Sequence, residues 1–347
     1  MCNLAGYAGK KNAAPILIEM LRQQQSYDGA LSTGVATIHK GKLYYRKVVG
    51  DVDALLRETD ALNLPGTIGI AHSRPAGDKN LPHPYISMDE RMAVITNGYT
   101  PRNQYSYLTD NVITLLEEKG FKFSTEMPFP KDGFPSLKNG HAVSPAEARV
   151  HLTDYYIKEL GLNMEDAMIK CSEEMFADNV YMTLSADYPD SISALRTTRP
   201  MNALLADGEV YLSTTVVGFP ENVKGNIMSL PIFHVCTVTC DCIRIGSKSM
   251  HPVESVCEIT PGAYIKAYDA VVEFLGGKEE NPPYLDEIVD YVSLSCPDIW
   301  EEKHTYSQIV RLTYETLDRL RSEGKLKTVI LPDERNGLTR GLIHFWL

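Results

Sequence analysis

The sequence predicts a layered α+β fold, and two features of the chain lead to this prediction. From Met1 to about Asp269, many short β-rich segments follow one another, separated by turns, with a few amphipathic helices between groups of them. After a polar segment rich in Gly, Pro and Glu, the pattern changes to helices followed by a hairpin. Groups of strands interrupted by helices are typical of packed layers, whereas strict alternation of strand and helix would predict a parallel βαβ sheet.

The elements of the first part are predicted in order along the chain. Residues 11–25 should form a helix, because Ala13, Leu17, Met20 and Leu21 have the i, i+4, i+7, i+8 spacing of one buried face. The remaining elements of this part are strands over 34–38, 42–49, 67–71 and 92–96, helices over 105–119 and 145–160, and strands over 180–184, 192–196, 203–205, 209–214 and 233–245.

A change of composition divides the chain into two units. The polar, Gly- and Pro-containing segment predicts a linker at residues 271–284. We therefore expect one domain at residues 2–270 and a smaller module at residues 285–347.

The smaller module is predicted to contain helices and a hairpin. Apolar residues recur at helical spacing over 285–292 and 306–320, and Gly324 is a helix stop signal. Two strands, over 327–331 and 338–346, should follow, joined by a turn. This order resembles a winged-helix module, but acidic residues outnumber basic ones in it, so a protein-interaction role is favoured over DNA binding.

Composition narrows the classes of function. The chain has 347 residues, of which 44% are hydrophobic and 23% charged, as in ordinary globular proteins. Its 34 Lys and Arg stand against 45 Asp and Glu, a net charge of −11, which does not favour nucleic acid as a partner. No apolar run is long enough to cross a bilayer, and seven cysteines, an odd number, indicate reduced thiols. We expect a folded, cytoplasmic protein without a membrane partner.

Cys2 is the most informative single residue. Because its side chain is small, we expect the initiator Met1 to be removed, which leaves a cysteine with both a thiol and a free α-amine. An α-amine titrates near ~7.7–8.0 and a thiol near ~8.5, so the amine can take the thiol proton and pass it to a leaving group. By itself, a cysteine at this position is equally compatible with an ordinary thiol.

Several further blocks accompany Cys2 in a fixed order. They are Met1–Gly9 (MCNLAGYAG), Tyr44–Val52 (YYRKVVGDV), Pro65–Arg74 (PGTIGIAHSR), Asn80–Pro84 (NLPHP) and Met92–Gly98 (MAVITNG). In order and spacing, these blocks resemble the class II glutamine amidotransferases, which are N-terminal-nucleophile hydrolases, and above all the glutaminase domain of glutamine–fructose-6-phosphate aminotransferases. The resemblance implies a four-layer αββα sandwich for the first domain and hydrolysis of the side-chain amide of L-glutamine.

The resemblance also implies roles for individual residues. It makes Cys2 the nucleophile, and it places the side-chain amide of Asn97 and the backbone N–H of Gly98 in an oxyanion hole. It implies that Arg74 binds the α-carboxylate of glutamine, a role that suits a bidentate guanidinium, and that His83 lines the site. Apart from the other blocks, Asn97-Gly98 fits a type I′ hairpin turn, Arg74 a surface cation and His83 a structural histidine.

The sequence departs from the family pattern at several positions. Asn3 replaces a glycine, and Pro75–Asp78 replaces a run that supplies two glutamine-contacting side chains. The acidic residue that holds the α-ammonium group is not in its usual setting: Glu147 is the nearest match, and Glu126 and Asp132 are rivals.

Partners follow from the same resemblance. The residues after Asp269 are too few for the sugar-isomerase part of that family, so we expect the ammonia acceptor on a separate synthase subunit, of sugar-phosphate isomerase type or another. Association of identical subunits stays open. Two alternatives also stay open: a C–N amidohydrolase acting on another amide, and a sensor or scaffold with weakened catalysis.

A cluster of possible metal ligands is interpreted as structural. His234, Cys236, Cys240 and Cys242 would share one face of the strand predicted over 233–245, but paired C-x₂-C elements are absent. Small cysteines in the core are the favoured interpretation, and neither a metal nor a cofactor is expected.

Overall fold

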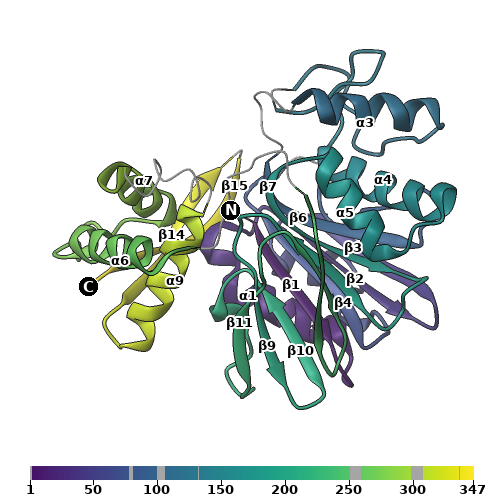
Figure 1. Ribbon diagram of the computed structural model, residues 1–347. Helices are drawn as coiled ribbons and strands as arrows, with labels where there is room; N and C mark the ends of the chain where they lie inside the picture. Colours follow the sequence, from purple (N-terminus) through teal and green to yellow (C-terminus); the bar gives the residue numbers. More distant parts are fainter. Residues whose placement is uncertain are drawn as a thin grey trace.

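The computed structural model describes residues 2–77, 81–99, 106–131, 133–250, 259–297, 308–335 and 337–347. Two antiparallel sheets form its centre (Figure 1). The larger sheet has seven strands in the order β11-β9-β10-β1-β4-β2-β3. Their bounds are Asn226–Ser229 (β11), Asn202–Ala206 (β9), Glu209–Ser213 (β10), Asn3–Ala8 (β1), Ile68–Arg74 (β4), Ser32–His39 (β2) and Lys42–Val49 (β3).

The second sheet has six strands in the order β13-β12-β8-β7-β6-β5. Their bounds are Ile243–Lys248 (β13), His234–Val238 (β12), Ile192–Arg196 (β8), Asp178–Ser185 (β7), Met92–Tyr99 (β6) and Tyr85–Ile86 (β5). Leu4, Ile70 and Leu212 of the larger sheet share one buried core with Ile95 and Met182 of the smaller sheet. The two sheets therefore pack face to face through alternate apolar residues of their strands.

Helices cover the outer face of each sheet. Helix α1 (Ala13–Asp28) and helix α2 (Val52–Glu58) share a buried core with the larger sheet. Helices α4 (Pro145–Leu160) and α5 (Met164–Glu174) pack on the smaller sheet, and α3 (Ser106–Glu118) packs on α4. The result is a mixed α and β structure in which helices lie outside two stacked sheets. Two short 3₁₀ turns, η1 (Ala61–Asn63) and η2 (Val216–Gly218), lie between strands.

Helix α4 shows how local sequence fixes an element that matters for the site. Ser144 caps its first turn by accepting a hydrogen bond from the backbone N–H of Ala146, and Pro145 occupies the first helical position. The helix ends at Gly161, which adopts φ 66° in the left-handed region that glycine tolerates best.

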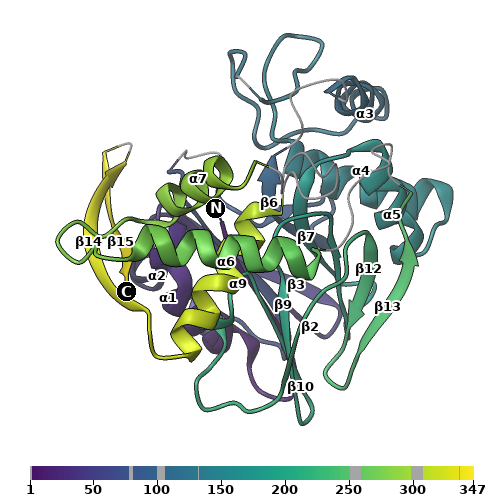
Figure 2. The same cartoon turned by 60° about the vertical axis from the view of Figure 1, so that its left-hand side comes forward.

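The C-terminal module packs against one end of the stacked sheets (Figures 1 and 2). It comprises α7 (Leu285–Ser295), α9 (Ile309–Ser322) and a hairpin of β14 (Lys327–Arg335) and β15 (Leu338–Trp346), and α6 (Pro261–Leu275), which precedes the predicted start of the module, packs with it. These elements share a buried core that includes Tyr27 from the end of α1. Its winged-helix-like character stays a prediction.

The structure differs from the sequence-based expectations at three places. Helix α6 runs through the first part of the segment predicted as a linker, as far as Leu275. The strand expected over 233–245 is broken by a turn into β12 and β13, so Cys236 is buried while Cys240 and Cys242 do not lie in the core. Strand β14 continues through Pro332 to Arg335, because an edge strand tolerates a proline that donates no hydrogen bond.

Among the described residues, no helix is both long and apolar enough to span a lipid bilayer.

Candidate functional site

A cavity of about 360 Å³ opens at one end of the stacked sheets and is lined by Cys2. Arg74, His83, Asn97 and Gly98 also line it, so the structure brings five of the six predicted site residues to one place. A volume of this size is within the range of ~300–1,000 Å³ typical of small-molecule sites.

The register of the larger sheet explains why Cys2 and Arg74 meet. Strands β1 and β4 are antiparallel, and Asn3 pairs with Ser73. The residue before Asn3 and the residue after Ser73 therefore emerge at the same end of the sheet. The Arg74 guanidinium donates a hydrogen bond to the carbonyl oxygen of Leu81 over 2.6 Å, which holds the side chain at the cavity.

Cys2 and Asn97 are in direct contact across the two sheets. The backbone nitrogen of Cys2 donates to the side-chain oxygen of Asn97 over 3.1 Å. In the assigned orientation of this amide, the oxygen faces the nitrogen of Cys2, so the NH₂ group points elsewhere. Burial raises the pKa of the Cys2 thiol, while the positive charges of Arg74 and Arg199 oppose this shift.

Asn97 and Gly98 lie within strand β6 and not in a turn. They pair with Val180 and Asn179 of β7, which rules out the hairpin-turn interpretation of this dipeptide. Gly98 has φ 129°, and a side-chain carbon placed on it would lie 2.0 Å from the carbonyl oxygen of Asp178. A glycine is therefore required here by both conformation and space.

Two stacked histidines fix the backbone just before Asn97. His72 and His83 stack with ring centroids 3.9 Å apart. A ring nitrogen of His72 is 3.0 Å from the carbonyl oxygen of Thr96, and the N–H of Thr96 points to Nδ1 of His83 over 3.4 Å. Burial is the main cause that lowers the pKa of His72 to about 3 and the pKa of His83 well below its usual value. Both rings are therefore neutral near pH 7.

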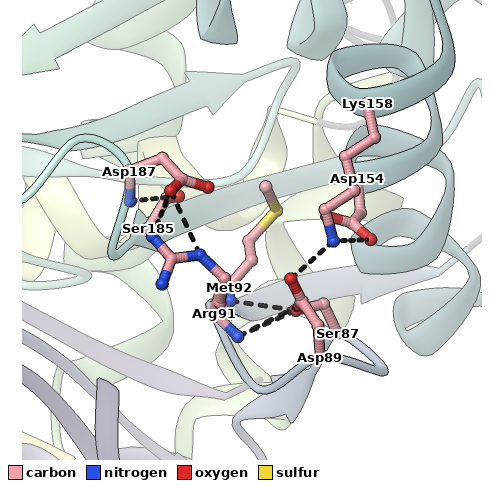
Figure 3. Close-up of polar contacts among 8 residues, drawn as sticks. All are labelled: Ser87, Asp89, Arg91, Met92, Asp154, Lys158, Ser185 and Asp187. Atoms are coloured by element: carbon pink, nitrogen blue, oxygen red, sulfur yellow. Dashed lines mark hydrogen bonds and ion pairs between the residues drawn. The ribbon is translucent and has the colours of Figure 1, made fainter. Parts of the chain in front are cut away.

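Contacts outside the cavity brace strand β6 and helix α4 (Figure 3). Lys158 of α4 contacts Asp89 over 2.6 Å and Asp154 over 2.8 Å, which ties the β5–β6 connection to the helix. On the other side, Arg91 forms an ion pair with Asp187. These contacts fix the start of the strand that carries Asn97 and Gly98 at its far end.

Glu147 does not line the cavity. Its carboxylate accepts hydrogen bonds from the backbone N–H groups of Ser124 and Thr125, at 2.8 and 2.9 Å, and from both hydroxyls. Burial opposes ionisation, but these bonds and the His151 ring, whose Nε2 lies 3.7 Å from the carboxylate, outweigh it and lower the pKa of Glu147 to about 2. The carboxylate is thus bound by the segment before α4.

The two rivals of Glu147 do not provide the missing acid in the described structure. Glu126 contacts His141 over 2.6 Å and Asn139 over 3.0 Å at the surface, and it does not line the cavity. Asp132 lies outside the described residues.

Several cavity residues carried no signal in the sequence. Arg199 follows the end of β8, and Ser144 to Ala146 form the amino end of α4, where the helix dipole favours negative charge. Asp28, at the end of α1, and Asp286, Val310 and Arg335 of the C-terminal module also line the cavity. Only the paired register of the strands and the packing of the module bring such distant residues together.

Known proteins similar to this chain in sequence include glutamine–fructose-6-phosphate aminotransferases. The chain is 27% identical over 227 residues to the glutamine–fructose-6-phosphate aminotransferase of Pyrococcus horikoshii, which covers 63% of this chain and 33% of that protein. It is 30% identical over 224 residues to the enzyme of the same name from Clostridium tetani, covering 62% of this chain and 32% of that protein. The chain thus spans about a third of the length of these curated relatives. No protein-family model matches it.

A solved structure supports the fold. The glutamine phosphoribosylpyrophosphate amidotransferase from B. subtilis, complexed with ADP and GMP, superposes with a TM-score of 0.57 at 14% identity, over 78% of this chain and 58% of that one. At this identity the likeness concerns the fold. The sequence matches confirm the resemblance found in the motifs, because both relatives are glutamine–fructose-6-phosphate aminotransferases.

Proposed function

We propose that this protein is a glutamine amidotransferase in which Cys2, exposed at the amino terminus by removal of Met1, is the nucleophile. One observation carries the proposal: the nitrogen of Cys2 contacts the side chain of Asn97 over 3.1 Å, inside a cavity that Arg74 also lines. A nucleophile, an oxyanion donor and a carboxylate-binding cation in one cavity are the parts that hydrolysis of a glutamine amide needs. We further propose that the stacked sheets and their covering helices form an αββα sandwich of the N-terminal-nucleophile hydrolase type.

The proposed chemistry has two steps. Cys2 Sγ attacks the side-chain carbonyl of glutamine while its proton passes to the α-amine, and the carbonyl oxygen becomes an oxyanion bound by Asn97 and Gly98. The C–N bond then breaks, the amine returns the proton to the leaving group, and ammonia departs. Water hydrolyses the resulting γ-glutamyl thioester and releases glutamate and the thiol.

Burial of Cys2 fits this order of events. Because the pKa of its thiol is raised, the resting group is protonated, and the base must act during the attack. An α-amine that titrates near ~7.7–8.0 is suited to that task near neutral pH. The neighbouring Arg74 and Arg199 then stabilise negative charge as it develops.

Two further parts of the proposal concern substrate and acceptor. We assign the α-carboxylate of glutamine to Arg74, with His83 lining the site beside it. We propose an ammonia acceptor as second substrate, because the aminotransferases matched here name a second substrate beside glutamine, and we place this acceptor on a separate synthase subunit.

The experiment is ammonia release from L-glutamine by the wild type and by Cys2→Ala, with the amino terminus defined by intact mass. We expect loss of at least about 10³-fold in kcat for Cys2→Ala, because removal of the nucleophile of a catalytic unit has effects of this size or larger. A thiol-reactive glutamine analogue, 6-diazo-5-oxonorleucine, should label Cys2. Ammonia release by protein that retains Met1, or labelling of another cysteine, would contradict the mechanism.

A further inference from the structure

The C-terminal module forms one wall of the catalytic cavity. Asp286 in the first turn of α7, Val310 in α9 and Arg335 at the end of β14 all line it. The cavity is therefore enclosed by both parts of the chain, although the sequence suggested only a docking role for the module.

Aromatic packing anchors this wall to the first domain. Tyr27, near the end of α1, stacks on Tyr314 with centroids 5.7 Å apart and contacts Phe345 at 5.6 Å. The next residue, Asp28, accepts a hydrogen bond from Arg340 of β15 over 2.8 Å, and both side chains are about 5% exposed. A buried ion pair beside stacked rings holds the module in one position relative to the cavity.

Among the described residues, the charges in the cavity leave one carboxylate for a ligand. Three guanidinium groups of this part of the chain line the cavity, from Arg74, Arg199 and Arg335, and so do two acids, Asp28 and Asp286. The carboxylate of Asp28 is bound by Arg340. That of Asp286 makes no ion pair or hydrogen bond within the part of the chain that the structure describes, and it is exposed to the cavity solvent.

An α-amino acid ligand needs two charged partners. Its carboxylate can be bound by the guanidinium group of Arg74, as proposed above, whereas its ammonium group would be repelled by the guanidinium groups of the cavity and requires an acceptor. Glu147, the acid expected from the sequence, is held outside the cavity by Ser124 and Thr125. Asp286 lines the cavity and carries a carboxylate, so it can accept the ammonium group.

We infer that Asp286, supplied by the C-terminal module, is the carboxylate that binds the α-ammonium group of the substrate. The inference rests on the proposed function, because it assumes that the ligand is glutamine. It makes the module part of the active site, so that selection of an α-amino acid over a simple amide depends on a residue far from the nucleophile in sequence. Glutamine binding and the position of the module are then coupled.

The test compares L-glutamine with 4-carbamoylbutanoate, which is glutamine without its α-amino group. In Asp286→Asn we expect kcat/KM for L-glutamine to fall about 10- to 150-fold, mainly through KM, as for loss of a charge-assisted contact. The kcat/KM for 4-carbamoylbutanoate should stay unchanged, so the preference for L-glutamine over 4-carbamoylbutanoate should fall by the same factor. Asp290→Asn is the matched control, because Asp290 is exposed one helical turn further on and lines no part of the cavity. It should leave the preference intact.

Outcomes separate this inference from the proposed function. An unchanged preference in Asp286→Asn, with wild-type thermal stability, overturns the role of Asp286 and leaves the proposed function standing. If the wild type hydrolyses neither compound, the proposed function fails. The role of Asp286 is then tested by measuring the binding of both compounds by calorimetry. Selective loss of L-glutamine binding in Asp286→Asn supports the inference, and equal binding, or no binding to the wild type, overturns it.

Discussion

The two walls of the cavity are built in different ways. The first consists of strand ends, where β1, β4 and β6 place Cys2, Arg74 and Asn97 through sheet register. The second consists of side chains on α7, α9 and β14, which depend on how a separate core packs against α1. Backbone hydrogen bonds fix a strand end closely, whereas a packed module can be displaced as a unit. We therefore expect changes in the first wall to alter chemistry, and changes in the second wall to alter stability and substrate selection.

The largest effect is expected where the second wall is anchored. Arg340→Ala leaves Asp28 buried without its cation, which costs about 3–5 kcal/mol in comparable buried pairs. Urea unfolding should show this loss. Arg319→Ala is the control, because its ion pair with Glu323 is exposed to solvent and contributes little to stability. Equal effects of the two variants would show that the module is not anchored by the buried pair.

The next effect concerns the proposed oxyanion hole in the first wall. A side chain on Gly98 would meet the carbonyl of Asp178 at 2.0 Å, so Gly98→Ala should move the N–H away from its position. We expect kcat to fall about 10²–10³-fold, the usual cost of one lost oxyanion donor. Gly262→Ala is the control, because nothing lies within 4 Å of the added carbon. An unaltered kcat in a folded Gly98→Ala variant would contradict the assigned hole.

Arg74 tests substrate binding in the first wall. Arg74→Ala should raise KM for glutamine about 10- to 150-fold, because a charge-assisted bidentate contact is worth ~1.5–3 kcal/mol. Steady-state ammonia release measures the change, and kcat should fall less than KM rises. Glutamine hydrolysis that is indifferent to Arg74 would show that the carboxylate binds elsewhere, with Arg199 and Arg335 as the remaining guanidinium groups of the described cavity.

The smallest effect is a pH dependence at the junction of module and first domain. Burial raises the pKa of Asp318 in α9 to about 7, against the opposing charge of Arg321, which also contacts Tyr27. Since the folded pKa exceeds the unfolded value of ~3.9, the folded state binds the proton more tightly. This contribution to stability is complete below the unfolded pKa and is lost as pH rises through about 7. The difference between the unfolding free energies at pH 5 and pH 8 should be smaller in Asp318→Asn than in the wild type. An equal difference in the two proteins would contradict the raised pKa of Asp318.

The sequence by itself could predict the first wall, because its residues lie in short blocks. Cys2, Arg74, His83, Asn97 and Gly98 were named from motifs, and all five line one cavity. Strand existence was also predictable from β-rich segments. The sequence could not predict whether Asn97-Gly98 forms a turn or a strand, because both structures satisfy local preferences. Only the pairing with β7 decides between them.

Glu147 shows where a motif-based assignment meets tertiary structure. It was placed by chain position, at the first turn of a predicted helix, and that helix is present. The turn places its carboxylate against the N–H groups of Ser124 and Thr125, which satisfy it fully. A local pattern can locate such an acid on a helix but not tell which neighbours will bind it.

What the sequence by itself predicted is thus the mixed α and β class of the fold, from local patterns, and five residues of the cavity, through the resemblance of short blocks to a known family. Tertiary structure alone decided the second wall. Asp286, Val310 and Arg335 follow Cys2 by more than half the chain, and their approach depends on the packing of Tyr27 between Tyr314 and Phe345 and on the buried pair of Asp28 with Arg340. Such contacts arise from the shapes and charges of two folded surfaces, and no local sequence signal specifies which surfaces will meet.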